Sequence, residues 1–303
     1  MLIGLSIAVS VGAVGCYYYL FRPVRPKWTQ AELDEFVQSA QLPGDSLVWK
    51  VVNGKLSNEQ KQVIQRAFRK GPDFRWIAAG KDMDEIIHDP KEHSDASLSI
   101  LAKDHRDLVN YMIKCMLAFL ENYSTAVIAA YDATTDEFVG SMSLVPPEYT
   151  TRSKKWLYQV HFLSSVMKFG QPLPVKQGPG PAARFQAFDD GCTILKNKII
   201  QEATSNNNNT DSTRTNSTAP HWTVEVVAVA DQAQGRGIGR QLLTLAKHVS
   251  TKTETPMYLC CHQENLAFYQ KMGFREVSRH TMTPRGIEDT TSLDFYGLTF
   301  TPK

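Results

Sequence analysis

The sequence has little net charge and few cysteines. Its 303 residues include 33 lysines and arginines against 31 aspartates and glutamates, which leaves a formal charge of +2. Proteins that bind nucleic acid usually carry a strong basic field, so this balance argues against DNA or RNA as a partner. The five cysteines form no CxxC pair and are odd in number, so neither a disulfide framework nor a zinc site is indicated. This pattern fits a reducing compartment.

Charged residues are missing altogether from residues 2–21. About 20 apolar residues are needed to cross a bilayer as a helix. Three tyrosines end this run and three basic residues follow it: Tyr17, Tyr18 and Tyr19, then Arg22, Arg25 and Lys27. The pattern predicts a single-pass transmembrane anchor over residues 1–22, with the rest of the chain in the cytosol, because basic residues flank only its C-terminal end. A cleaved signal peptide is the alternative, although the basic residues that open such a peptide are absent.

The rest of the chain has an ordinary globular composition, with 42% hydrophobic and 21% charged residues overall. Residues 23–55 are mixed in character, and we assign them to a tether and N-terminal appendage. Within it, a short helix over residues 29–40 begins at a threonine N-cap. Residues 56–303 form the main domain. Residues 148–220 lack a sustained period and are interpreted as an insertion. Within it, only residues 156–169 and 185–200 resemble ordered structure, and the polar tract at about 204–218 is too poor in apolar residues to order itself.

Several elements of the main domain follow from periodicity. Apolar residues at helical spacing predict helices over residues 57–70 and 104–122. Two apolar runs around a short polar stretch predict a β-hairpin over residues 126–131 and 137–144. The last third of the chain predicts a β-α-β-α-β-β order, over residues 222–229, 237–250, 257–261, 265–272, 274–281 and 293–300.

Three glycines alternate between a predicted strand and a predicted helix, in the segment Gln234-Gly235-Arg236-Gly237-Ile238-Gly239-Arg240. The free amides and the dipole of a helix N-terminus favour an anion such as phosphate. A Walker A loop would end in Gly-Lys-Ser/Thr, but Arg240 and Gln241 follow the last glycine here. A dinucleotide fingerprint would need GxGxxG, and the third glycine comes one residue early. An ordinary glycine-rich turn remains the alternative.

The spacing resembles the (Gln/Arg)-x-x-Gly-x-(Gly/Ala) signature of the GNAT superfamily of N-acetyltransferases, matched by Gln234, Gly237 and Gly239. A second segment is similar to that family's second motif: His262-Gln-Glu-Asn265-Leu-Ala-Phe-Tyr269-Gln-Lys-Met-Gly273-Phe274. The two motifs stand in the family's order, and the likeness covers about residues 99–300. It implies an α/β fold with a mixed, mostly antiparallel sheet of six or seven strands, helices on both faces, and a cofactor cleft where two central strands diverge.

The resemblance also implies that acetyl-CoA binds as a co-substrate and that no metal is required. The cofactor pyrophosphate would lie against main-chain amides of the glycine loop, and the pantetheine arm would lie near the asparagine of the second motif. The candidate cofactor-binding residues are Val227, Val229, Gln234, Gly235, Arg236, Gly237, Ile238, Gly239, Arg240 and Asn265.

Acetyl transfer to an amine needs one group that accepts the amine's proton and one that supplies a proton to the departing thiolate. Glu225, on the strand that leads to the glycine loop, is the candidate base, and its alternative role is purely structural. Tyr269 matches the family tyrosine that approaches the cofactor sulfur, so it is the candidate acid, with a core aromatic as the alternative. The segment Cys260-Cys261-His262 suggests a ping-pong mechanism with an acetyl-cysteine intermediate, but ordinary burial of cysteine in a strand explains the same residues.

The leading interpretation is an N-acetyltransferase that acts on a primary amine by direct attack, with a small-molecule acceptor slightly favoured over a protein. The alternative is a non-catalytic, membrane-tethered module that binds CoA as a sensor or scaffold. Acceptor specificity is expected to reside in residues 73–97 and 148–220. The glycosylation sequons at Asn122, Asn208 and Asn216 matter only if the membrane topology is reversed.

Overall fold

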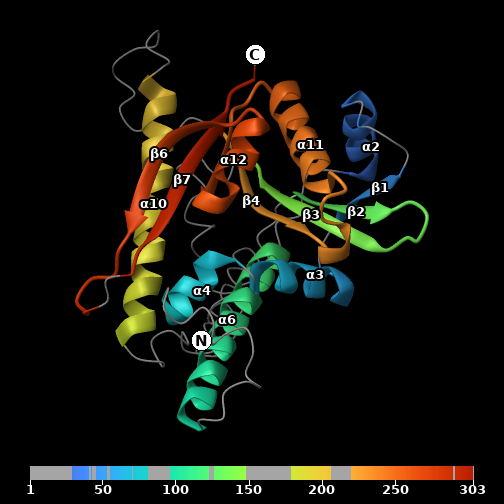
Figure 1. Cartoon of the computed structure of the whole chain (residues 1–303). Coiled ribbons are helices and arrows are strands. Elements are labelled where there is room, and N and C mark those ends of the chain that lie inside the picture. The colour runs from blue at the N-terminus through green and yellow to red at the C-terminus, as the bar shows by residue number, and fades with distance from the viewer. Residues whose placement is uncertain are drawn as a thin grey trace, which may run out of the picture.

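A seven-stranded sheet forms the centre of the molecule (Figure 1). The computed structural model describes residues 29–40, 42, 46–52, 55–69, 71–80, 96–122, 126–147, 179–205, 220–288 and 291–302. The strand order is β1-β2-β3-β4-β5-β7-β6, and only the β4–β5 pair is parallel. This confirms the predicted mixed, mostly antiparallel sheet. The strands are β1 Leu47–Val52, β2 Ala126–Asp132, β3 Phe138–Val145, β4 Trp222–Val229, β5 Met257–His262, β6 Arg275–Met282 and β7 Leu293–Phe300.

Helices cover both faces of the sheet, as the sequence predicts (Figure 1). On one face, α2 and α11 pack over a core cluster built on leucines of α11. On the other, α3, α4, α6 and α10 enclose a second cluster. The helices are α2 Gln30–Ser39, α3 Asn58–Arg69, α4 Pro72–Ala79, α6 Ala96–Asn122, α10 Pro179–Ser205, α11 Ile238–Lys252 and α12 Gln263–Lys271, with a short 3-10 helix at Asp231–Ala233.

Two helices begin where their sequences predict. Thr29 caps α2 because its hydroxyl accepts a hydrogen bond from the Glu32 amide at 3.2 Å, while the Glu32 carboxylate accepts one from the Thr29 amide. Ser57 caps α3 in the same way, accepting from the Gln60 amide at 3.1 Å. Both caps satisfy backbone donors that the first helical turn leaves without a partner.

The segment assigned to a tether and appendage also supplies a strand of the sheet. β1 pairs antiparallel with β2, from Leu47 opposite Asp132 to Val52 opposite Val127. α2 packs against β1 and α11, and the Ser39 hydroxyl lies 2.6 Å from Nε2 of His248. β1 is apolar except for Lys50, and its apolar side chains include both the buried Trp49 and the exposed Val48, so the segment lacks the alternation of apolar and polar residues that marks a half-buried strand. α2 and β1 therefore pack against β2 and α11.

The predicted insertion contains a 27-residue helix, α10. The sequence indicated ordered structure only near residues 156–169 and 185–200, because Pro179, Gly180 and Pro181 resemble a turn. Proline is tolerated in a first helical turn, where its missing N–H has no partner to lose, so α10 begins inside that segment. α10 packs against β6, β7 and α4. The predicted transmembrane anchor, the segment 156–169 and most of the predicted loop at 204–218 lie outside the described residues.

The described ranges contain no helix with both the length and the hydropathy to cross a membrane.

Candidate active site

A β-bulge sits at the centre of strand β4. In the pairing of β3 with β4, Ser143 lies opposite Val226 and Leu144 lies opposite Val224, so Glu225 is the extra residue. Because of the extra residue, alternate side chains after the bulge face the opposite side of the sheet from those before it. Trp222 and Val224 belong to the core cluster under α11, whereas Val226 belongs to the cluster under α6. Bulges of this kind re-aim a side chain and are frequent beside active sites.

The two central strands part at the level of this bulge. β4 and β5 are paired in parallel over only three residues each, from Trp222 opposite Met257 to Val224 opposite Leu259. Beyond Leu259, β5 continues to pair with β7 on its other edge, up to His262. The pairing between β4 and β5 therefore ends just after Val224. Beyond this point, backbone N–H and C=O groups on the facing edges of the two strands are available to a ligand. The strands diverge where the family resemblance places the cofactor.

The glycine loop follows β4 and ends at the N-terminus of α11. Gly237 is the N-cap residue with a φ of 81°, and Gly235 has a φ of 79°. These left-handed conformations suit glycine, and a Cβ at either position would meet no atom within 4 Å. No side chain caps the helix, and the first amide with an intrahelical partner is that of Gln241, which donates to the Gly237 carbonyl at 3.0 Å. An uncapped helix N-terminus beside open space is an anion-binding geometry.

The side chains of the loop have different surroundings. Arg236 forms an ion pair with Asp132 at 2.6 Å, and this pairing lowers the pKa of that aspartate. The Arg236 guanidinium therefore holds the loop against the β2–β3 hairpin, so its charge is already paired, although Arg236 is a candidate cofactor-binding residue. Its amide donates a long hydrogen bond, 3.4 Å, to the Ala233 carbonyl. Gln234 donates to Asp231 at 3.3 Å, while Arg240 is exposed.

The remaining candidate cofactor residues are apolar or lie on α12. Val227 and Val229 are partly buried against the α11 cluster, and Ile238 is fully within it. Asn265 is exposed, with its amide nitrogen 3.4 Å from Nε2 of His262. Phe268, which precedes Tyr269 in the second motif, was not among the candidate cofactor residues, yet its side chain is 38% exposed and would lie 3.5 Å from a Cβ at Gly239. Phe268 thus joins α12 to the glycine loop.

Glu225 is enclosed by the protein on the side of α10. Burial raises the pKa of its carboxyl group, and the nearby charge of Lys196 partly offsets that effect. Glu225 in turn contributes to the raised pKa of two thiols, Cys192 on α10 and Cys260 on β5. These three residues and Lys196 therefore gather at the opening between β4 and β5. The sequence offered no signal for Lys196 or Cys192, because α10 reaches the site only through long-range packing.

Cys260 does not have the properties of a nucleophile. Part of the Cys260 side chain is exposed to solvent, but many protein atoms surround the thiol. This burial raises the pKa of the thiol to about 12, and the charge of Glu225 makes a smaller contribution in the same direction. The thiol is then protonated at neutral pH, and the thiol form is a poor nucleophile. Ordinary placement in a strand explains this cysteine better than the ping-pong role.

Tyr269 lies on the other side of the opening, on the helix that follows β5. Its ring packs edge-to-face against Phe268 and Phe274, with ring centroids 5.3 and 6.1 Å apart. Burial, with a smaller contribution from Cys261, raises the pKa of the phenol above its ordinary value. The hydroxyl therefore keeps its proton at neutral pH, which is the form that a hydrogen-bond donor requires.

A histidine and an aspartate also lie near this opening, and the sequence did not mark them as a pair. His262 ends β5, and its Nδ1 is buried without a hydrogen-bond partner among the described residues. Asp73, in the first turn of α4, has a pKa that burial raises and the charge of His262 lowers. The two are thus close enough to interact electrostatically. They are a further polar pair on the face that carries α4 and α10.

Comparisons with known proteins bear on the family. Residues 190–276 match the family model of the acetyltransferase (GNAT) domain, a segment that includes the bulge, the glycine loop and α12. A comparison with curated protein sequences found no match.

Several solved structures resemble the chain. For NAA60 of Arabidopsis thaliana in complex with a bisubstrate analogue, the alignment has 12% identity and a TM-score of 0.36 and covers 85% of this chain and 99% of that one. The alignment with the polyamine N-acetyltransferase of Drosophila melanogaster has 10% identity and a TM-score of 0.38, and it covers 84% of this chain and 99% of that one. The alignment with mosquito arylalkylamine N-acetyltransferase-like 5b has 12% identity and a TM-score of 0.32, and it covers 84% of this chain and 100% of that one. Likenesses of this quality carry no argument about substrate. The family match over residues 190–276 and the two motifs agree, so this part of the chain is similar to the acetyltransferase domain of the GNAT family.

Proposed function

We propose that the protein transfers an acetyl group from acetyl-CoA to a primary amine by direct attack. The observation that carries the proposal is the uncapped N-terminus of α11 beside the point where β4 and β5 part, with Glu225 at the bulge between them. The residues fit a CoA phosphate, since the loop glycines face open space and the first amides of α11 have no side-chain cap. Bound acetyl-CoA would supply the acetyl thioester.

Glu225 is the proposed general base. A free alkylamine is protonated at pH 7, so its attack requires an acceptor for one proton. A carboxylate whose pKa is raised toward neutrality holds an abstracted proton better than an ordinary surface carboxylate. Lys196, by partly offsetting the shift, helps to keep Glu225 ionised at neutral pH. Glu225 accepts the first proton from the ammonium group. The neutral amine nitrogen then bonds to the acetyl carbon while the carbon–sulfur bond breaks, and the second proton lost by the nitrogen ends on the departing CoA thiolate.

Tyr269 is the proposed hydrogen-bond donor to the departing sulfur. An alkyl thiol has a pKa of about 8.5, below the value of about 10 for an ordinary tyrosine phenol. Because burial raises the pKa of Tyr269 further, complete proton transfer from it is uphill. A hydrogen bond that stabilises the leaving thiolate is therefore favoured over full transfer. This refines the role of general acid that the family position implies.

A thiol-release assay distinguishes this function from that of a CoA-binding scaffold. The purified full-length chain would be mixed with acetyl-CoA and a panel of primary amines, including small aromatic and aliphatic amines and peptides with a free N-terminus. We expect release of free CoA thiol that depends on the amine. CoA binding with no release for any amine would favour the scaffold. The panel also decides between a small-molecule acceptor, which we slightly favour, and a protein.

Replacement of Tyr269 by phenylalanine tests the donor role. Phenylalanine keeps the packing with Phe268 and Phe274, so CoA affinity and thermal stability should stay close to those of the wild type. The turnover rate should fall by about 10–10²-fold, since a hydrogen bond to a charged group is worth about 1.5–3 kcal/mol. Steady-state kinetics should place the loss in kcat. A fully active Tyr269→Phe enzyme would reduce this tyrosine to a packing residue.

The location of the enzyme is a separate proposal that rests on residues 1–22. Their composition predicts a single-pass anchor with the catalytic domain in the cytosol. Protease added to sealed vesicles from expressing cells should digest the domain. Protection of the domain, or glycans at Asn122, Asn208 or Asn216, would show the reverse topology.

A further inference from the structure

The exposed part of the glycine loop has one polar contact with a distant segment of the described chain. Ala233 before it and Ile238 after it are buried, whereas residues 234–237 between them are all exposed. The glutamine that opens this span bonds back within the same segment at 3.3 Å, and a Cβ on either of its glycines would meet no atom within 4 Å. The distant contact is the ion pair of Arg236 with Asp132 of β2, at 2.6 Å.

The main chain of this span needs such a contact to keep one conformation. Gly235 and Gly237 have φ values of 79° and 81°, and glycine loses more conformational freedom on ordering than any other residue. A phosphate bound by main-chain amides requires those amides to point in one direction. Because Arg236 lies between the two glycines, an anchored Arg236 side chain restricts the peptide groups on either side of it. The ion pair therefore lowers the entropic cost of ordering the loop around a ligand.

The partner of Arg236 is itself held in place. One carboxylate oxygen of Asp132 accepts hydrogen bonds from the amides of Thr134 and Thr135, at 3.0 and 3.3 Å, and the other oxygen accepts from the guanidinium. The Asp132 amide donates to the Glu137 carbonyl at 2.9 Å, which closes the β2–β3 turn. The hairpin therefore presents one carboxylate oxygen to the loop in a defined direction.

The charge of the pair argues against a direct role of the guanidinium at the phosphate. Asp132 already compensates the charge of Arg236, and the pairing lowers the pKa of that carboxyl group, so it stays ionised at neutral pH. We propose that Asp132 is a positioning residue for CoA: through Arg236, it holds the glycine loop in the conformation whose amides receive the pyrophosphate. This role rests on the proposed binding of CoA to the glycine loop. Neither sequence motif includes Asp132, which lies 104 positions before its partner.

Asp132→Asn tests this role in a calorimetric titration of the full-length protein with CoA. Asparagine keeps an oxygen for the Thr134 and Thr135 amides, so the melting temperature should be nearly unchanged. CoA affinity should fall about three- to tenfold, because the loop must then be ordered on binding. In the acetylation assay, KM for acetyl-CoA should rise while kcat at saturation stays the same, since the reacting groups are untouched.

A double-mutant cycle separates this role from direct contact between Arg236 and the phosphate. Arg236→Gln breaks the same ion pair, so the double variant Asp132→Asn/Arg236→Gln should bind CoA as the single variants do. Losses that add in the double variant, or CoA binding by Asp132→Asn that equals or exceeds that of the wild type, would overturn the positioning role alone. Wild-type protein that fails to bind CoA would overturn the proposed function with it.

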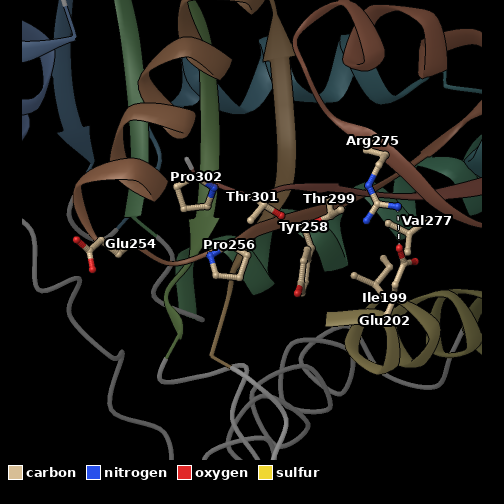
Figure 2. A pocket seen from close by; sticks show the side chains of 10 residues that line it. All are labelled: Ile199, Glu202, Glu254, Pro256, Tyr258, Arg275, Val277, Thr299, Thr301 and Pro302. Atoms are coloured by element: carbon tan, nitrogen blue, oxygen red, sulfur yellow. Dashed lines mark ion pairs between the residues drawn. The ribbon is translucent and has the colours of Figure 1, made fainter. Parts of the chain in front are cut away.

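Two other ion pairs provide matched controls. Asp136, in the same turn, pairs with Lys50 at 3.1 Å. Figure 2 shows Glu202 on α10 paired with Arg275 on β6, at 2.7 Å, beside a pocket that lies where β4 and β5 begin, at the opposite end of β4 from the glycine loop. Asp136→Asn and Glu202→Gln should leave CoA affinity unchanged. Weakened CoA binding in either control would show that loss of any ion pair lowers affinity, and would contradict the assignment to Asp132.

Discussion

Replacement of Gly237 by valine is expected to abolish CoA binding. The backbone at this position has a φ of 81°, which a β-branched residue adopts only with strain, and the valine side chain would project into the open space beside the first amides of α11. Loss of two hydrogen bonds to a charged pyrophosphate, each worth about 1.5–3 kcal/mol, corresponds to a weakening of about 10²–10⁴-fold. Calorimetric titration with CoA measures it.

Gly286 provides a matched control for backbone strain. Its φ of 76° is similar, and a Cβ there would also meet nothing within 4 Å, but it lies in the β6–β7 connection. Gly286→Val should therefore carry a comparable cost in stability, of about 1–2 kcal/mol, and leave CoA affinity unchanged. If a folded Gly237→Val protein bound CoA as tightly as the control, the glycine loop would not be the phosphate site.

Replacement of Glu225 by glutamine should lower the acetylation rate by about 10²–10⁴-fold at pH 7, the usual worth of a positioned general base. Only the deprotonated carboxylate accepts a proton, and burial raises the pKa of Glu225 above its ordinary 4.5. The wild-type rate should therefore rise with pH through this raised pKa. The rate of Glu225→Gln should not show this rise. It should approach the wild-type rate only at alkaline pH, where the amine is already deprotonated. Rate profiles from pH 5 to pH 10 for both proteins provide the measurement.

Glu276→Gln is the matched control, since Glu276 is a half-buried glutamate on β6 that lies beside another register shift. Its rate profile should follow that of the wild type. If Glu225→Gln matched the wild type at pH 7, water or another group would take the proton. The His262–Asp73 pair would then be the next candidate, because both lie on the face of the sheet that carries α10.

The parts of the fold that sequence reasoning predicted are those with local signals. The β2–β3 hairpin and the β-α-β-α-β-β ending follow from alternation and helical periodicity within short windows. β1 was missed as a strand because an apolar edge strand lacks the alternation that marks a half-buried strand. The first turn of α10 was missed because Pro179, Gly180 and Pro181 resemble a turn, although proline fits that position of a helix.

The residues of the candidate site likewise comprise some with a local sequence signal and others that depend on long-range packing. The glycine loop was recognised because its spacing is local, and the structure places it at an uncapped helix N-terminus. The bulge at Glu225 depends on the register between β3 and β4, and neither strand alone encodes it. Lys196 and Asp73 reach the site from helices distant in sequence, so only the packed fold brings them near Glu225 and His262. The pairing of Arg236 with Asp132 likewise depends on a contact between residues 104 positions apart.

The proposed reaction is direct transfer of the acetyl group from CoA to an amine, without an acetylated protein. It is tested by mixing the full-length protein with acetyl-CoA labelled in its acetyl group, first alone and then with a primary amine. We expect that the protein acquires no covalent label at any time, since the Cys260 thiol is protonated at neutral pH, and that label appears on the amine only after its addition. Label on the protein before the amine is added, or bound acetyl-CoA that never labels any amine, would contradict it.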